Sequence, residues 1–167
     1  MKTIKILIVT VLVFTSNRAI AQVEKYMAAF TYQICKSTTW PNQSSEFVIG
    51  VIGESPISKY FELMAKEKKM GDKAIKFYKW KNANEIKACN VIFIPQSETS
   101  QLDQITNTLT NKPVLIVTED AETMNKGATI SFKIIDNKIR YNLNKTELLK
   151  RKLSIQSTIE RMALKVY

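Results

Sequence analysis

The chain has 167 residues, of which 25 are basic and 15 acidic, so that its formal net charge is +10. It contains no histidine, and therefore lacks the commonest general base, the commonest metal ligand and the usual partner of a nucleophilic serine or cysteine. This composition excludes most familiar hydrolase mechanisms and indicates a protein without a metal or cofactor.

The first 21 residues have the pattern of a secretory signal peptide. Lys2 and Lys5 precede an apolar run over residues 6–14, and Ala19 and Ala21 give the small-residue pattern of a cleavage site. We predict cleavage after Ala21, with a retained amphipathic anchor as the alternative. The predicted domains are therefore a signal peptide over 1–21 and one exported domain over 22–167.

Cleavage would remove three basic residues and no acidic one, which lowers the net charge from +10 to +7. In a cytosolic protein this positive charge would suggest a nucleic-acid partner, but for an exported protein we expect none. The charge indicates either a solvated basic surface or attraction to acidic lipids, polysaccharides or an acidic partner protein.

The two cysteines, Cys35 and Cys89, would both remain in the exported domain. An even number of cysteines in an oxidising compartment favours a disulfide between them. The alternative is two buried free thiols that pack as small apolar side chains.

Hydrophobic periodicity predicts helices and strands that alternate along the chain. Short apolar runs without alternation indicate strands that are covered on both faces, as in a parallel sheet. The predicted fold is a single three-layer α/β domain, in which a mainly parallel sheet is flanked by helices and is followed by a C-terminal antiparallel hairpin and a helix. The expected elements are a helix over Val23–Lys36, a strand over Phe47–Ile52, a helix from Pro56 with Ser55 as its cap, a strand over Ala74–Trp80, a short helical stretch near 83–88, a strand over Val91–Ile94, a helix through Leu102 and Leu109, a strand over Val114–Val117, a hairpin of Ala128–Ile135 with Lys138–Leu143, and a helix over Lys145–Tyr167.

The predicted C-terminal helix carries an apolar stripe that includes Leu153, Ile155 and Ile159. Basic side chains lie opposite this stripe or in the turn before it. We therefore expect Lys150, Arg151 and Lys152 to form an exposed surface that attracts an acidic partner.

Polar residues follow three of the predicted parallel strands, where ligands of open α/β sheets bind. These residues outline one candidate crevice for a small ligand. The carboxylates could also act as acid and base, although acidic residues at helix starts explain them without any chemistry. The candidate crevice residues are Glu54, Ser55, Gln96, Ser97, Glu98, Glu119 and Asp120.

Aromatic residues gather in and just after the first predicted helix, at Tyr26, Phe30, Tyr32 and Trp40. They could form a binding platform. The alternative, which helical spacing favours, is that they fill the core.

Several blocks of the chain resemble the YfiR-like family of periplasmic proteins. The first block is the aromatic-rich helix over 26–36 with the Trp40-Pro41 ending. Later blocks follow in the family's order, at Phe47–Pro56, Ala88–Glu98, Gly127–Asn144 and Leu153–Tyr167. The resemblance covers nearly the whole predicted exported domain.

The resemblance implies a periplasmic α/β domain that is frequently dimeric and has no catalytic activity. The family's type member restrains an inner-membrane diguanylate cyclase by binding its periplasmic portion, and release raises cyclic di-GMP; similar domains occur with sensor kinases. Cys89 matches a cysteine that many members carry, whereas Gly50 stands at about the place of its usual partner. We therefore expect a periplasmic regulator of a membrane cyclase, and the alternatives are a small-ligand sensor for a histidine kinase and a carboxylate-based hydrolase.

Overall fold

The computed structural model describes residues 22–41 and 44–167. The predicted signal peptide over 1–21 lies outside the described residues. Both the cleavage site and the start of the exported domain therefore stay predictions.

The centre of the molecule is a seven-stranded sheet with the order β3-β4-β2-β5-β6-β7-β8. The five strands from β4 to β7 are parallel, and β3 and β8 pair antiparallel to their neighbours at the two edges. In chain order the strands are β2 (Glu46–Ile52), β3 (Lys69–Met70), β4 (Lys73–Trp80), β5 (Val91–Ile94), β6 (Leu115–Thr118), β7 (Ile130–Ile135) and β8 (Lys138–Leu143).

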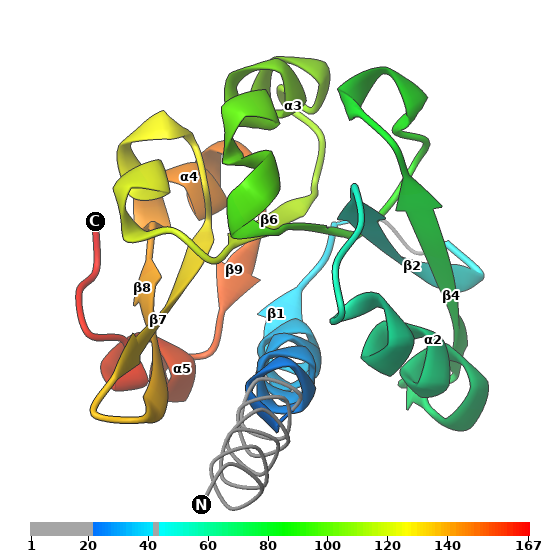
Figure 1. Ribbon diagram of the computed structural model, residues 1–167, viewed down its shortest axis with the longest axis horizontal. Helices are drawn as coiled ribbons and strands as arrows, with labels where there is room; N and C mark the ends of the chain where they lie inside the picture. The colour runs from blue at the N-terminus through cyan, green and yellow to red at the C-terminus, as the bar shows by residue number, and fades with distance from the viewer. Residues whose placement is uncertain (1–21, 42–43) are drawn as a thin grey trace, which may run out of the picture.

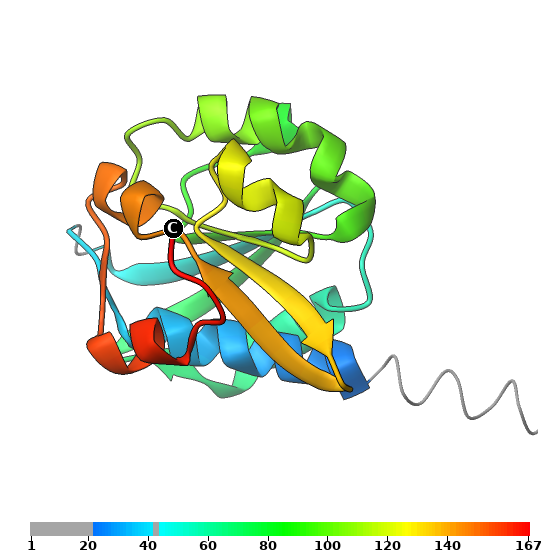
Figure 2. The same cartoon turned by 90° about the vertical axis from the view of Figure 1, so that its left-hand side faces the viewer.

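Helices cover both faces of this sheet (Figure 2). Residues 22–36 form one helix, called helix 22–36 below, which lies with α2 on one face. α3 and a short 3₁₀ helix, η1, lie on the other face. The predicted three-layer α/β fold with a C-terminal hairpin is thus confirmed. The helical elements after helix 22–36 are α2 (Ser58–Glu67), η1 (Ala83–Glu85), η2 (Gln96–Gln101), α3 (Leu102–Thr108), η3 (Ala121–Lys126), α4 (Lys145–Lys150) and α5 (Ser157–Met162).

Two hydrophobic clusters hold the layers together, and β5 and β6 contribute to both. Val91 and Phe93 point to the cluster under helix 22–36 and α2, whereas Ile92 and Ile94 point to the cluster under α3. Every residue of β5 and β6 is buried. Their unbroken apolar runs therefore follow from burial on both faces.

Side-chain caps fix several helix starts close to the predicted places. The Oγ of Ser55 accepts from the Ile57 backbone N–H at 3.4 Å, so Ser55 acts in the turn before α2, which begins two residues later than predicted. Asp120 caps η3, and Asn144 caps α4 by accepting from the Glu147 N–H. Each cap satisfies a backbone donor that the helix itself leaves without a partner.

The hairpin is followed by a helix as predicted, but the helix does not run through to Tyr167, because the chain leaves the helical path after α4. Lys152 has a φ of 58°, and the backbone N–H of Leu153 donates to the Leu148 carbonyl, which closes α4 in a Schellman turn. Two buried leucines, Leu148 and Leu153, accompany this turn. The turn escaped prediction because a lysine holds the left-handed position where glycine is the usual signal.

Beyond this turn, tertiary pairing determines the backbone. β9 (Ser154–Ile155) pairs antiparallel with β1 (Thr38–Thr39), which follows helix 22–36. After α5, the last residues run beside β8, where Val166 forms a parallel bridge with Leu143. Figure 1 shows β1 and β9 side by side. The C-terminal segment therefore pairs both with the strand that follows helix 22–36 and with the hairpin.

Cys35 and Cys89 are free thiols in the structure, in agreement with the second of the two sequence alternatives. Cys35 is buried in the cluster beneath helix 22–36, whereas Cys89 packs against the cluster on the opposite face of the sheet. Burial raises the pKa of both thiols, that of Cys89 to about 12. Neither is therefore a reactive thiolate at neutral pH.

Gly50, which stands near the place of the family's second cysteine, has the Trp80 ring directly against it. A Cβ built on Gly50 would lie 1.9 Å from the Cζ3 atom of Trp80. The indole therefore occupies the space that any side chain at position 50 would need.

We expect Gly50→Ala to lower the free energy of unfolding by about 1–3 kcal/mol, the usual cost of overpacking a core. In a Trp80→Leu background the same change should cost much less, because the clash is gone. Urea unfolding of the four proteins in this cycle measures both costs. Equal costs in the two backgrounds would contradict the assigned contact.

Candidate partner-binding groove

The structure brings two of the predicted crevice residues together at the carboxyl ends of the parallel strands. The Gln96 backbone N–H, just after β5, donates to Oε2 of Glu119, just after β6, at 3.0 Å. Both residues line a cavity of about 330 Å³. Its other lining residues come from helix 22–36 and β7, and they are Val23, Glu24, Met27, Lys133 and Ile134.

The other predicted crevice residues do not line this cavity and have local roles. Glu54 forms an exposed ion pair with Lys79 at 2.6 Å. Oε2 of Glu98 accepts from Gln101 at 2.7 Å. Asp120 and Ser55 accept backbone N–H groups at helix starts, and Ser97 is exposed. These contacts agree with the structural explanation of the acidic residues.

Sequence reasoning missed Glu24, which helix 22–36 brings to the same cavity as Glu119. Burial raises the pKa of Glu24, the charge of Glu119 raises it further, and Lys59 lowers it. Burial also raises the pKa of Glu119, against the hydrogen bond from Gln96. Two partly desolvated carboxylates therefore repel each other where the helix crosses the strand ends.

We expect Glu24→Gln to stabilise the protein at neutral pH. A carboxyl whose pKa is raised on folding costs stability once it is ionised, and this cost disappears below its ordinary pKa of 4.5. The gain should therefore be present at pH 7 and shrink as the pH falls toward 4. Unfolding free energies across this range measure it.

Glu67→Gln, an exposed change on α2, serves as the matched control and should show no comparable gain. A gain for Glu24→Gln that is the same at pH 4 and pH 7 would contradict the electrostatic cause.

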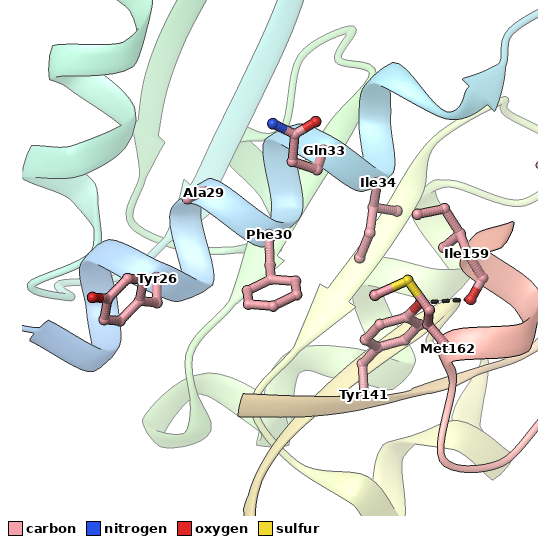
Figure 3. Close-up of a pocket in the computed structure, with 8 residues that line it drawn as sticks. All are labelled: Tyr26, Ala29, Phe30, Gln33, Ile34, Tyr141, Ile159 and Met162. Carbon is pink, nitrogen blue, oxygen red and sulfur yellow. Dashed lines mark hydrogen bonds between the residues drawn. The ribbon is translucent and has the colours of Figure 1, made fainter. Parts of the chain in front are cut away.

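An apolar pocket of about 250 Å³ lies between helix 22–36, β8 and α5 (Figure 3). The helix contributes Tyr26, Ala29, Phe30, Gln33 and Ile34, and the opposite wall consists of Tyr141, Ile159 and Met162. The Tyr141 hydroxyl donates to the Ile159 carbonyl at 2.5 Å, which holds α5 against the hairpin. Burial raises the pKa of Tyr141 to about 12, so this donor keeps its proton.

The pocket continues along helix 22–36 toward the tip of the hairpin. A neighbouring cavity of about 640 Å³ shares Tyr26 and Phe30 with it and adds Ile134, Lys138 and Ile139 among its lining residues. We call the two cavities together the apolar groove. Tyr26 is 48% exposed, Ile134 49% and Met162 59%, although all three are large apolar side chains. Exposed apolar surface of this kind makes the apolar groove a candidate binding surface.

Of the four aromatic residues singled out in the sequence, two line the groove and two pack as structural residues. Tyr26 and Phe30 line the apolar groove, where Phe30 also packs edge-on against Phe132 with ring centroids 6.5 Å apart. Trp40 packs against Phe47 at 5.2 Å, and Tyr32 donates its hydroxyl to the Lys69 carbonyl. Tyr32 and Trp40 are therefore structural, while Tyr26 and Phe30 belong to the candidate site.

The expected exposed basic surface does not form as predicted. Arg151 is only 4% exposed and donates from Nη1 to the Leu109 carbonyl at 2.9 Å. Lys150 pairs with Glu147 at 2.7 Å, and Lys152 is exposed in the left-handed turn. Because α4 ends at this point, the three side chains do not share one solvent-facing surface.

The part of the chain that the structure describes holds no group of three acidic or cysteine side chains that could bind a metal ion. Within the same residues, no helix is both long enough and apolar enough to span a bilayer.

The family model of YfiR/HmsC-like proteins matches residues 24–163. The chain belongs to this family. Among solved structures, the fold of this YfiR/HmsC-like protein is similar to that of a conserved domain protein from Vibrio cholerae O1 biovar El Tor strain N16961, with a TM-score of 0.60. The two are 10% identical, and the match covers 86% of this chain and 60% of the Vibrio chain, so the likeness concerns the fold alone. No curated protein matches the chain.

Proposed function

We propose that this YfiR/HmsC-like protein is an exported, periplasmic regulator that restrains a membrane-anchored diguanylate cyclase by protein contact. The observation that carries this proposal is the apolar groove, which exposes large side chains on a domain of this family. The occupant we propose is an apolar segment of the cyclase's periplasmic portion. Burial of Tyr26, Ile134 and Met162 against it would supply the binding free energy.

The chemical equipment of the chain supports a regulatory role rather than catalysis. It has no histidine, and the carboxylates at the strand ends act in caps and ion pairs or repel each other across a cavity. None of these interactions requires a catalytic role. Regulation through contact needs no reactive group, only a surface that the partner can bind.

The groove also has the form that helix recognition uses. One wall is a helix and the other is formed by a hairpin and α5, so an amphipathic helix can lie lengthwise and place apolar side chains at intervals of three and four residues. Lys138 lies in the lining near the hairpin tip. This lysine and the net positive charge of the chain favour an occupant that carries acidic residues beside its apolar ones.

We expect Met162→Glu to weaken binding to the cyclase's periplasmic portion at least about tenfold, because a charge would be buried in an apolar contact. Leu149→Glu is the matched control. Leu149 is 63% exposed and Met162 59%, and both lie on short helices, but Leu149 is outside the groove. Surface plasmon resonance with wild type and both variants measures the difference.

A salt series distinguishes this groove from the basic residues as the main contact. Binding through the groove should weaken only modestly from low to high salt, because Lys138 is the one charged residue among the groove's described lining residues, whereas Lys150→Glu with Lys152→Glu should slow association if the basic residues dominate. Equal affinities for wild type and Met162→Glu would overturn the groove as the contact. Loss of self-association in Met162→Glu, seen by sedimentation, would instead assign the groove to a homodimer of this chain.

A second candidate function is that of a sensor, which binds a small polar ligand and signals to a sensor kinase. The cavity at the strand ends favours it, since Glu24, Gln96, Glu119 and Lys133 place polar groups around about 330 Å³. Genes for a membrane cyclase or a kinase beside this one would distinguish the two functions.

Export itself gives a further expected outcome. The exported protein should begin at Gln22, because a basic start, an apolar run and small residues occur in the order that signal peptidase requires. N-terminal sequencing of protein from the periplasmic fraction measures this. An intact Met1 species confined to the cytosol would contradict it.

A further inference from the structure

We infer that a cavity around Arg151 binds a small hydroxylated molecule that carries one oxyanion, a phosphate or a carboxylate. The cavity has a volume of about 510 Å³ and lies between α3, η3 and α4. It shares no lining residue with the apolar groove or with the cavity at the strand ends. Its function would therefore be separate from partner contact.

The Arg151 guanidinium is buried at this cavity and is not fully hydrogen-bonded. Arg151 is 4% exposed, and its Nη1 donates to the Leu109 carbonyl at 2.9 Å. Its Nε is buried and has no hydrogen-bond partner among the described residues. Oε2 of Glu147 forms a long ion pair with Nε at 3.9 Å, beyond hydrogen-bond distance. Burial of a charged group without full hydrogen bonding is costly, and an anion bound in the cavity that Arg151 lines would offset this cost by its charge.

The side chains around the cavity carry a net positive charge. Lys126, Lys150 and Arg151 line it, and Glu147 is the single carboxylate among the lining residues. Glu147 already pairs with Lys150 at 2.7 Å. The remaining positive charge comes from Lys126 and Arg151, which favours an anionic ligand.

The uncharged part of the cavity lining is polar. It consists of amide and hydroxyl side chains, and among these Asn107 and Asn125 are exposed at the cavity. Amides both donate and accept, which suits the hydroxyl groups of a sugar or polyol. The guanidinium offers planar paired donors, which suit a carboxylate or phosphate. Together they define a sugar acid or a sugar phosphate as the class of ligand.

Gly127 keeps the cavity in shape from the η3 side. Its φ is 94°, and a Cβ there would lie 2.9 Å from the Cγ2 atom of Thr106 on α3. η3 and α3 therefore approach each other at a point where only glycine fits. Figure 2 shows α3, η3 and α4 on the side of the sheet away from helix 22–36, so a ligand here leaves the groove open.

Isothermal titration tests this site with three probes at constant ionic strength: glucose 6-phosphate, glucuronate and glucose. We expect saturable one-to-one binding of at least one of the two anions and none of glucose. The anion that binds identifies phosphate or carboxylate as the recognised group. Failure of both anions to bind would overturn the proposal and leave Arg151 as a purely structural link between α3 and α4.

Variants then place the binding. Lys126→Glu should weaken it at least about tenfold, the effect of losing one charged hydrogen bond. Asn107→Ala should weaken binding of the sugar anions while leaving the fold intact. The matched control, Lys69→Glu, changes an exposed lysine on edge strand β3 and should leave affinity unchanged. Arg151→Lys keeps the charge but loses the fork, and should weaken binding provided that circular dichroism shows it folded.

Amide chemical shifts of wild-type protein give a readout that needs no variant. Gly127 and Arg151 should shift on titration, and residues of the groove such as Ala29 should not. Shifts confined to other surfaces, or equal affinity in Lys126→Glu and Lys69→Glu, would overturn the assigned position. Because partner binding through the groove is measured separately, failure of this site leaves the proposed function untouched.

Discussion

Strands β5 and β6 have no side in contact with water, and most of the architecture follows from covering them. A parallel strand that is buried on both faces needs a layer of helices above and below, and its backbone groups must pair with strands on either side. Helix 22–36 and α2 cover one face and α3 the other. Since parallel neighbours all end at one edge, the same constraint brings Gln96 and Glu119 together.

The cover over the sheet also places helix 22–36 where some of its residues line the apolar groove. Its inner face, with Met27, Ala28 and Ile34, closes the core over the sheet. Phe30 reaches the hairpin through its contact with Phe132. Tyr26 on the same helix is half-exposed and lines the groove. One element therefore supplies both stability and a candidate binding surface.

The hairpin shows what local sequence can predict. Lys138–Leu143 is a strand with the predicted bounds, because alternation and the turn residues Asp136 and Asn137, both at positive φ, determine it locally. The C-terminal helix shows the opposite case. Residues 145–167 have helical periodicity, yet pairing of β9 with β1 and of Val166 with Leu143 overrides it. These partners lie far away in sequence, so no local pattern indicates them.

The candidate sites divide in the same way. Gln96 and Glu119 were predictable from the rule for parallel strand ends, and Tyr26 and Phe30 as one of two interpretations of the aromatic residues. Glu24 could not be predicted, because no local sequence pattern indicates which side of helix 22–36 faces the strand ends. The burial of Arg151 was missed for a related reason. A basic residue beside an apolar helical stripe is typical of the surface. The left-handed turn at Lys152, which redirects the chain, is not visible in that pattern.

The pairing of β1 with β9 has a consequence for the order of folding. The two walls of the groove, Phe30 on one side and Tyr141 and Ile159 on the other, come from segments far apart in the sequence. Contacts of such long sequence separation carry a large loop-closure entropy, which makes them slow to form. The groove therefore exists only on molecules whose N-terminal helix and C-terminal segment have both docked. A partner that bound the groove, as proposed above, would therefore bind folded chains and not incomplete ones, so that binding would depend on completed folding.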